Sequence, residues 1–173
     1  FSDFWLKRAL CYFKLGSIDL AFSDYQKSLP FPADKLSYRI RFLIKLKGKE
    51  RLMKQLDIQD IMSVSNKVAF KKNMQLLSQV DQVVKLFRES LSYHKNQEYE
   101  REKECLNSIL KIDDQLGMIY LMLGNNEQAV GDVRTANKYY SRADSLGFDL
   151  AREAINVNHI AKIVGYLDEL SES

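Results

Sequence analysis

Apolar residues recur along most of the chain at spacings of three and four, the period of an amphipathic helix. Residues 1–33 hold two such runs, which Gly16 separates and which Pro30 and Pro32 end. Glycine favours the end of a helix and proline cannot continue one, so this segment predicts a helical hairpin with a tight turn. The apolar positions of the two runs are Phe4, Trp5, Ala9, Tyr12 and Phe13, and then Leu20, Ala21, Tyr25 and Leu29.

Residues 34–63 repeat this arrangement with a weaker pattern. Gly48 lies 32 residues after Gly16 and marks the turn of a second helical hairpin. Residues 64–96 predict one long helix, because the apolar residues of 65–95 fall on one side of it. These residues are Leu77, Val80, Val84, Phe87 and Leu91.

Residues 97–147 predict a further pair of helices, both of them long. The first covers 98–123, and Gly124 begins the turn that follows it. The second helix is expected to run on to Leu146, because its small and apolar residues alternate steps of four and three. These residues are Ala129, Val133, Ala136, Tyr140 and Ala143.

The composition agrees with a helical chain. Its 173 residues are 46% hydrophobic and 28% charged, which excludes a disordered or membrane-embedded protein. Only two prolines and seven glycines favour long helices over many short strands. Residues 148–173 predict a last amphipathic helix. We therefore expect one all-α domain over residues 1–173, with about eight helices and no strand.

The cysteine content and the chain start indicate the cellular context. Cys11 and Cys105 are too few and too distant for a disulfide framework, which favours a reducing, cytoplasmic location. No apolar run approaches the ~18 residues that span a bilayer, so we expect no membrane association. The chain begins without an initiator methionine or a signal peptide, and we expect it to be part of a longer protein and a larger assembly.

Charge divides the chain into two halves. Residues 1–86 carry 16 Lys and Arg against 8 Asp and Glu, and residues 87–173 carry 10 against 15. The basic side chains concentrate between residues 35 and 54, where only Glu50 opposes them. Three interpretations stay open: a solvated face, a contact site for an acidic or phosphorylated protein segment, or an RNA contact. The basic residues are Lys35, Arg39, Arg41, Lys45, Lys47, Lys49, Arg51 and Lys54.

Signals for catalysis are missing from the sequence. It contains neither of the glycine-rich motifs that cradle phosphates, G-x-x-x-x-G-K and G-x-G-x-x-G. His94 and His159 have no Cys or carboxylate at metal-ligand spacing. The carboxylates between Glu98 and Glu104 are expected to form a solvated helix start or an acidic contact patch. We therefore predict that the chain is not an enzyme and uses no cofactor or metal.

The first hairpin resembles the tetratricopeptide repeat, whose pattern is W-x2-L-G-x2-Y…A-x3-F…P. Arg8 departs from the pattern, because it replaces the usual leucine, and Pro32 falls one place early. A second resemblance, at 113–143, starts from Leu116-Gly117 with Tyr120. The matching residues of the first hairpin are Trp5, Ala9, Tyr12, Gly16, Ala21, Tyr25 and Ser28.

The resemblance implies an α-solenoid whose first helices line a concave groove that holds a peptide or helix of a partner. Leu6 and Leu10 occupy the places of the Lys and Asn with which one subfamily grips chaperone carboxylates, which argues against that ligand. The groove face of these helices is mostly aliphatic, so we expect either a partner or another part of the same protein to fill it. The projected residues are Asp3, Leu6, Leu10, Phe13 and Lys14, and then Lys111, Asp114, Met118, Leu121 and Met122.

These patterns favour a protein-interaction scaffold or adaptor that docks partner segments through the groove and through the basic hairpin. Its candidate contacts on the basic hairpin are Arg39, Arg41, Lys45 and Lys49. One alternative is binding of RNA or another acidic ligand through residues 35–54. A second alternative is a helical regulatory domain of a larger enzyme.

Overall fold

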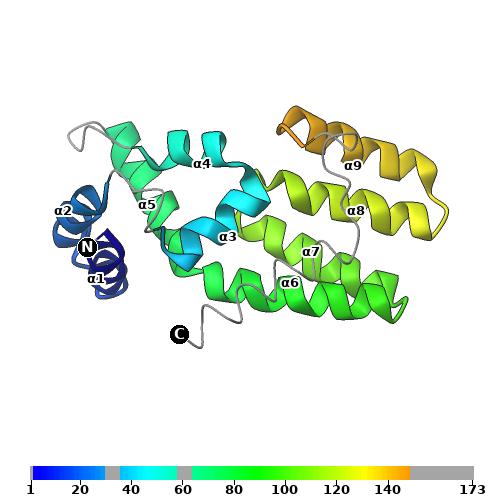
Figure 1. Ribbon diagram of the computed structural model, residues 1–173, viewed down its shortest axis with the longest axis horizontal. Coiled ribbons are helices and arrows are strands. Elements are labelled where there is room, and N and C mark those ends of the chain that lie inside the picture. Colours follow the sequence, from blue (N-terminus) through cyan, green and yellow to red (C-terminus); the bar gives the residue numbers. More distant parts are fainter. Residues whose placement is uncertain (1, 30–35, 58–63, 149–173) are drawn as a thin grey trace. The chain divides into compact units, whose positions relative to one another are not determined.

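The computed structural model describes residues 2–29, 36–57 and 64–148, and within them it contains nine helices and no strand (Figure 1). The predicted all-α class is confirmed. The predicted C-terminal helix over 148–173 lies, from residue 149 on, outside the described residues, as do the prolines at 30 and 32. The helices are α1 (Ser2–Lys14), α2 (Ile18–Ser28), α3 (Tyr38–Lys47), α4 (Lys49–Leu56), α5 (Val64–Ser78), α6 (Val80–Lys95), α7 (Tyr99–Ile112), α8 (Gly117–Ala129) and α9 (Val133–Ser145).

Helices α1 and α2 form the hairpin that the sequence predicts. Gly16 has a φ of +78°, and the Ser17 N–H donates to the carbonyl of Tyr12 at 2.9 Å, which closes α1 with a left-handed turn. Ala9 and Ala21 are fully buried between the two helices. Residues this small let the helix backbones approach closely.

The same turn recurs twice in the second half of the chain. The Glu98 N–H donates to the Tyr93 carbonyl at 2.8 Å, and the Asp132 N–H donates to the Glu127 carbonyl at 2.9 Å. The left-handed residues are Gln97, with a φ of 60°, and Gly131, with a φ of 90°. These two positions are 34 residues apart, so α6–α7 and α8–α9 are successive hairpins of one period. Helices α6 to α9 lie side by side in chain order (Figure 1).

The repeat register in this region differs from the predicted one. The predicted turn at Gly124 lies inside α8, and the turn is formed by Gly131 instead. A shift of 115 residues carries Ala9 onto Gly124, whereas the sequence pattern had placed Gly117 there. The reason is that two Leu-Gly pairs stand seven residues apart, about two helical turns, and so present similar faces.

The two predicted long helices are each interrupted. The segment over 65–95 breaks at Gln79 into α5 and α6, and the segment over 98–123 breaks after Ile112 into α7 and α8. Asp113 is extended, and its carboxylate accepts a hydrogen bond from the Gln115 N–H at 2.9 Å. An aspartate that bonds the backbone locally competes with the helical ladder, which explains the second break. The predicted helix from 129 to 146 is likewise divided at Gly131.

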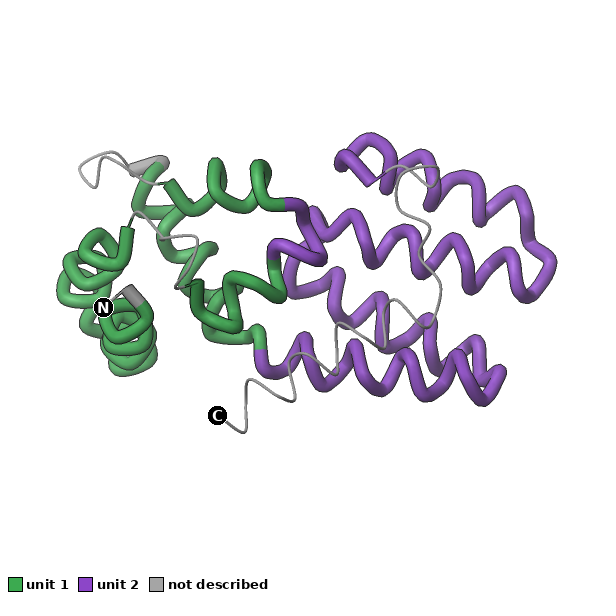
Figure 2. The backbone as a smooth tube through the Cα atoms, in the orientation of Figure 1, with its two compact units in different colours: residues 1–43, 49–80 green, residues 44–48, 81–173 purple. Residues whose placement is uncertain are grey.

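The chain divides into two compact units, which Figure 2 colours separately. Unit 1 consists of residues 1–43 and 49–80. Phe70 of α5 lies at its centre, with ring centroids 5.0 Å from Phe22 and 5.5 Å from Tyr25. The buried Tyr25 hydroxyl donates to the Leu56 carbonyl at 2.6 Å and so joins α2 to the end of α4. Burial raises the pKa of Tyr25, which keeps this hydroxyl protonated as a donor.

Unit 2 consists of residues 44–48 and 81–173, of which 44–48 and 81–148 are described. Its core includes Leu106 and Ile109 of α7 and Leu123 of α8, which are fully buried. The end of α3 belongs to this unit, because the buried Lys47 ammonium contacts the Asp113 carboxylate at 2.7 Å. Gly117 begins α8 against Phe148, whose ring leaves no space for a Cβ at residue 117.

Candidate protein-interaction surfaces

Two of the groove positions predicted on α1 are covered by the chain itself. Leu6 and Leu10 are buried, and α1 contacts α5 as well as α2. Phe13 is half-buried, whereas Lys14 is exposed. The sequence pattern could not show this packing, because α5 begins some fifty residues further along the chain.

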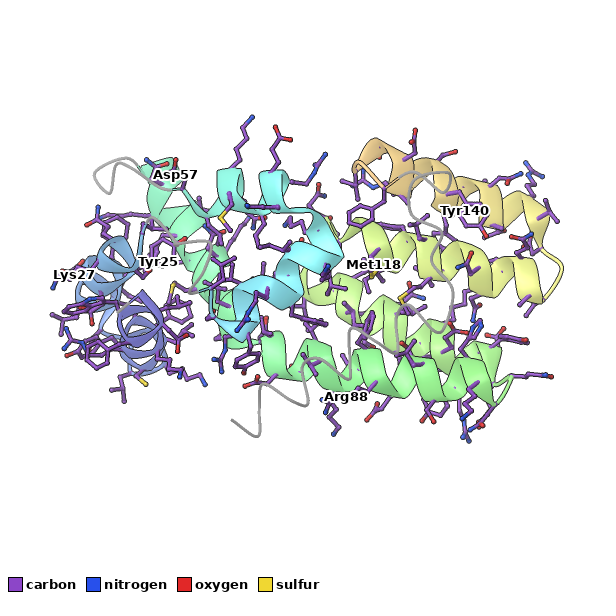
Figure 3. All side chains as sticks on the ribbon, viewed as in Figure 1. Tyr25, Lys27, Asp57, Arg88, Met118 and Tyr140 are labelled. Carbon is purple, nitrogen blue, oxygen red and sulfur yellow. The ribbon has the colours of Figure 1, made fainter. Side chains whose placement is uncertain are left out.

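The groove positions predicted on α8 belong to the core of unit 2. Met118, Leu121 and Met122 are buried, and Figure 3 shows Met118 within the helices of this unit. Asp114, which precedes α8, is exposed. The seven-residue difference in register accounts for this, because the groove face was projected from Gly117 rather than Gly124.

Lys35 of the basic segment 35–54 lies outside the described residues, and the other basic residues divide between α3 and α4. On α3, Arg39 and Arg41 are half-buried and only Lys45 is exposed. Lys47 is buried in its ion pair with Asp113, so it does not belong to a solvated face. On α4, by contrast, the basic side chains are all exposed: Lys49, Arg51 and Lys54.

Helix α5 adds basic residues that the sequence analysis did not single out. Lys67, Lys71 and Lys72 are exposed, and the first two are one helical turn apart. Two hydrogen bonds join α5 to α4: Gln55 Nε2 donates to Asn73 Oδ1 at 3.1 Å, and Asn73 Nδ2 donates to the Gln55 carbonyl at 2.9 Å. The signal in the sequence was the KK pair, which follows the buried Phe70 directly.

A cluster of cations and aromatic rings links α1 to α2. The Arg8 guanidinium donates to both carboxylate oxygens of Asp24, at 2.5 and 2.9 Å. It also lies 4.7 Å from the centroid of Trp5, and the Lys27 ammonium lies 4.7 Å from the same ring. The hydrogen bonds from Arg8 lower the pKa of the buried Asp24 carboxyl, and Lys27 lowers it further. The arginine that departs from the repeat pattern is thus matched by an acidic partner on α2.

The acidic start of α7 is partly a buried network rather than a solvated stretch. The Glu102 carboxylate is buried and lies 3.0 Å from the His94 Nδ1 atom. Asn126 Nδ2 of α8 donates to Glu102 Oε2 at 2.7 Å and to the Tyr99 carbonyl at 2.8 Å. Glu102 therefore joins α6, α7 and α8, at the position where Ala21 and Ala136 stand in the other two hairpins.

A comparison with known families identifies the first hairpin. The family model of the tetratricopeptide repeat matches residues 2–29, which contain all of α1 and α2. The chain resembles the tetratricopeptide repeat family. Comparisons with curated proteins and with solved structures found no match.

The tetratricopeptide resemblance supports a general role in protein–protein interaction. The small residues, the left-handed turn and the aromatic Tyr25 that the family pattern requires are all in place on α1 and α2. None of the helices in 2–29, 36–57 and 64–148 is long and apolar enough to cross a membrane. Over the same residues, no group of three or more His, Cys, Asp or Glu side chains could hold a metal ion.

Proposed function

We propose that this chain is a protein-binding scaffold that takes acidic segments of its partners on the basic surface of α4 and α5. The observation that carries the proposal is the exposure of six cations on these two helices. Two exposed acidic residues oppose them: Glu50 on α4 and Asp57 directly after it. We call them the basic surface: Lys49, Arg51, Lys54, Lys67, Lys71 and Lys72.

The basic surface is carried by a rigid framework. Leu52 and Leu56 of α4 and Phe70 of α5 are buried, so the inner faces of both helices are fixed in the core of unit 1. The paired hydrogen bonds between Gln55 and Asn73 hold the two helices together. Cations on fixed elements lose less entropy on binding than cations on a free loop, which favours a docking role.

An acidic protein segment fits this surface better than RNA does. Single-stranded RNA is typically held by exposed aromatic rings that stack on its bases, in addition to cations. The described residues of α4 and α5 contain one aromatic residue, Phe70, and its ring is buried. A run of carboxylates, by contrast, can be bound by lysine and arginine side chains without any aromatic ring.

The proposal is tested with two fluorescent probes, a short peptide of alternating Glu and Ser and an oligouridine RNA. The variant replaces Lys49, Arg51 and Lys54 by Glu, and a matched control makes the same replacement at the exposed residues Lys85, Lys95 and Lys111 of unit 2. Fluorescence anisotropy should show the acidic peptide bound by the parent chain and by the control. The α4 variant should bind it about tenfold more weakly or worse.

Two results would contradict the proposal. Equal loss of peptide binding in both variants would mean that net charge, and not the basic surface, attracts the peptide. Binding of oligouridine in preference to the peptide, with an affinity that falls steeply as salt is added, would assign the surface to RNA instead.

A further inference from the structure

Helices α1 and α8 are equivalent elements of two hairpins. The 115-residue shift that carries Gly16 onto Gly131 also carries Trp5 onto Tyr120 and Lys27 onto Arg142. The last pair makes the same contact in each hairpin: the Lys27 ammonium lies 4.7 Å from the Trp5 ring, and the Arg142 guanidinium lies 5.6 Å from the Tyr120 ring. What covers one helix therefore indicates what fits the other.

In unit 2, α7 covers one face of α8. Asn126 of α8 donates hydrogen bonds to the Tyr99 carbonyl and to Glu102, both on α7. The next residue, Glu127, forms an ion pair with Lys103 of α7. On the same face of α8, the side chains of Ile119 and Leu123 have no exposed surface. A helix in the position of α7 thus buries Ile119, Leu123 and Asn126, whereas Val130, at the end of α8, stays 49% exposed.

The equivalent face of α1 is exposed. The shift carries Ile119, Leu123, Asn126 and Val130 back onto Phe4, Arg8, Cys11 and Leu15, which share one side of α1 at spacings of four, three and four. Phe4 is 56% exposed and Leu15 is 78% exposed. Cys11 is also exposed. We call this set the outer face of α1.

We propose that the outer face of α1 docks an amphipathic α-helix of a partner protein, in the position that α7 takes on α8. The apolar stripe of the partner helix would cover Phe4 and part of Leu15, which otherwise leave a large aromatic and a large aliphatic side chain in water. A helix that lies in a groove with its apolar side inward is a common mode of protein recognition.

Charge along the outer face selects carboxylates on the flanks of the partner helix. Lys7 and Lys14 are exposed along one edge, and Lys27 is exposed along the other. Asp3 lies 2.8 Å from Lys7, and the buried Asp24 pairs with Arg8 and, at 3.6 Å, with Lys27. Lys7, Lys14, Lys27 and Arg8 thus outnumber these two acidic side chains. An incoming carboxylate therefore meets cations on both sides.

This inference deepens the proposed protein-binding role, but its surface shares no residue with the basic surface of α4 and α5.

The probe is a designed helical peptide with a leucine stripe flanked by Glu, compared with a peptide of the same stripe flanked by Lys. Binding to the full chain is measured by titration calorimetry. We expect the Glu-flanked peptide to bind and the Lys-flanked peptide to bind at least tenfold more weakly.

Cys11 reports where the peptide binds. Bound peptide should slow the alkylation of Cys11 by iodoacetamide, because the thiol lies in the middle of the outer face. Cys105 is the internal reference, since it is buried and burial raises the pKa of its thiol. Its slow reaction should not change when peptide is added.

The test variant is Phe4→Glu combined with Leu15→Glu, and its control is Val68→Glu, which changes an exposed apolar residue of α5. All three side chains are at least half exposed, so circular dichroism should show unchanged helicity. The double variant should lose at least tenfold in affinity for the Glu-flanked peptide. The Val68→Glu variant and the α4 charge-reversal variant should bind it as the parent chain does.

Three results would overturn the inference. One is unchanged binding in the double variant, and a second is a loss of binding in the α4 variant alone, which would place the peptide on the basic surface. The third is self-association of the parent chain in sedimentation that the double variant abolishes. That result would assign the outer face of α1 to a second copy of the chain.

Discussion

The ring of Tyr140 lies against the backbone of Gly124, so closely that a Cβ on residue 124 would come within 2.2 Å of Tyr140 Cε1. The Tyr140 hydroxyl is fixed on the same helix, at 2.9 Å from Asn125 Oδ1 and 2.7 Å from Gln128 Oε1. Figure 3 shows the side chain between α9 and α8. This contact sets the register of the α8–α9 hairpin.

A larger side chain at residue 124 should therefore destabilise the protein. Gly124→Leu is expected to lower the free energy of unfolding by roughly 1–3 kcal/mol, the usual effect of overpacking a close contact. Urea denaturation followed by circular dichroism measures the change. The same substitution in a Tyr140→Ala background should cost clearly less, because the ring that it meets is gone. Equal costs in both backgrounds would mean that the contact does not determine the packing.

The sequence determines the first hairpin well and the second only in part. Ala9, Gly16 and Ala21 each have a single possible role in α1–α2, and their predicted positions are confirmed. In α8, Gly117 and Gly124 both follow a leucine, and each packs against an aromatic ring: Gly117 against Phe148 and Gly124 against Tyr140. The local pattern cannot show which of the two glycines corresponds to Ala9 of the first hairpin, since this depends on where α9 begins.

The candidate site was harder to predict than the fold. Leu6 and Leu10 were predicted as groove residues because the repeat pattern places them on that helix face, but both are buried, and α1 contacts α5, far along the chain. Lys47 was expected at the surface, either solvated or in contact with an acidic ligand, and its ion pair with Asp113, 66 residues away, buries it instead. Long-range contacts of this kind leave no mark on the local spacing of residues.

The left-handed turn residue Gln97 gives a second prediction. Gln97 has a φ of 60°, whereas glycine occupies the equivalent positions 16 and 131. A residue with a side chain is disfavoured in this conformation by about 1 kcal/mol or slightly more. Gln97→Gly should therefore raise the free energy of unfolding by about 1 kcal/mol, measured by urea denaturation.

The reciprocal variant checks this explanation. Gly131→Ala should lower the free energy of unfolding by a similar amount, although the space around the position is open. The cost would then come from the backbone conformation alone. An Ala variant as stable as the parent chain would contradict the assignment of strain to these turns.

The pairing of Asp24 with Arg8 predicts a pH dependence of stability. The hydrogen bonds from Arg8 hold the pKa of Asp24 below its ordinary value of 3.8. A carboxyl whose pKa is lowered by folding stabilises the folded state above the pKa of the unfolded chain, and this stabilisation is lost as the pH falls through the folded pKa. Asp24→Asn should therefore unfold at a lower urea concentration than the parent chain at neutral pH.

The same comparison in acid provides the control. The difference between Asp24→Asn and the parent chain should shrink as the pH falls from about 4 toward 2, because the parent carboxyl is then protonated as well. A difference that stays constant over this range would mean that the ionised pair does not contribute to stability.

The buried ion pair between Lys47 and Asp113 leads to a fourth prediction. Lys47→Met removes the cation and leaves the Asp113 carboxylate largely buried without its partner, which should cost roughly 3–5 kcal/mol. Adding Asp113→Asn should recover part of this loss, since no charge is then left buried. Thermal unfolding of the two variants measures both effects. A single variant as stable as the double variant would contradict the pairing.

Gln97 and Gly131 occupy equivalent turn positions 34 residues apart, so the helical array could be shortened or lengthened in steps of 34 residues. Removal of residues 98–131 would place Asp132 directly after Gln97, where Glu98 now stands, and α6 would enter α9 through an unchanged type of turn. Insertion of another 34-residue segment at this junction would likewise preserve the type of turn. Duplication or loss of such a pair of helices can therefore change how many surfaces the protein presents, while the turns on both sides of it keep the same type.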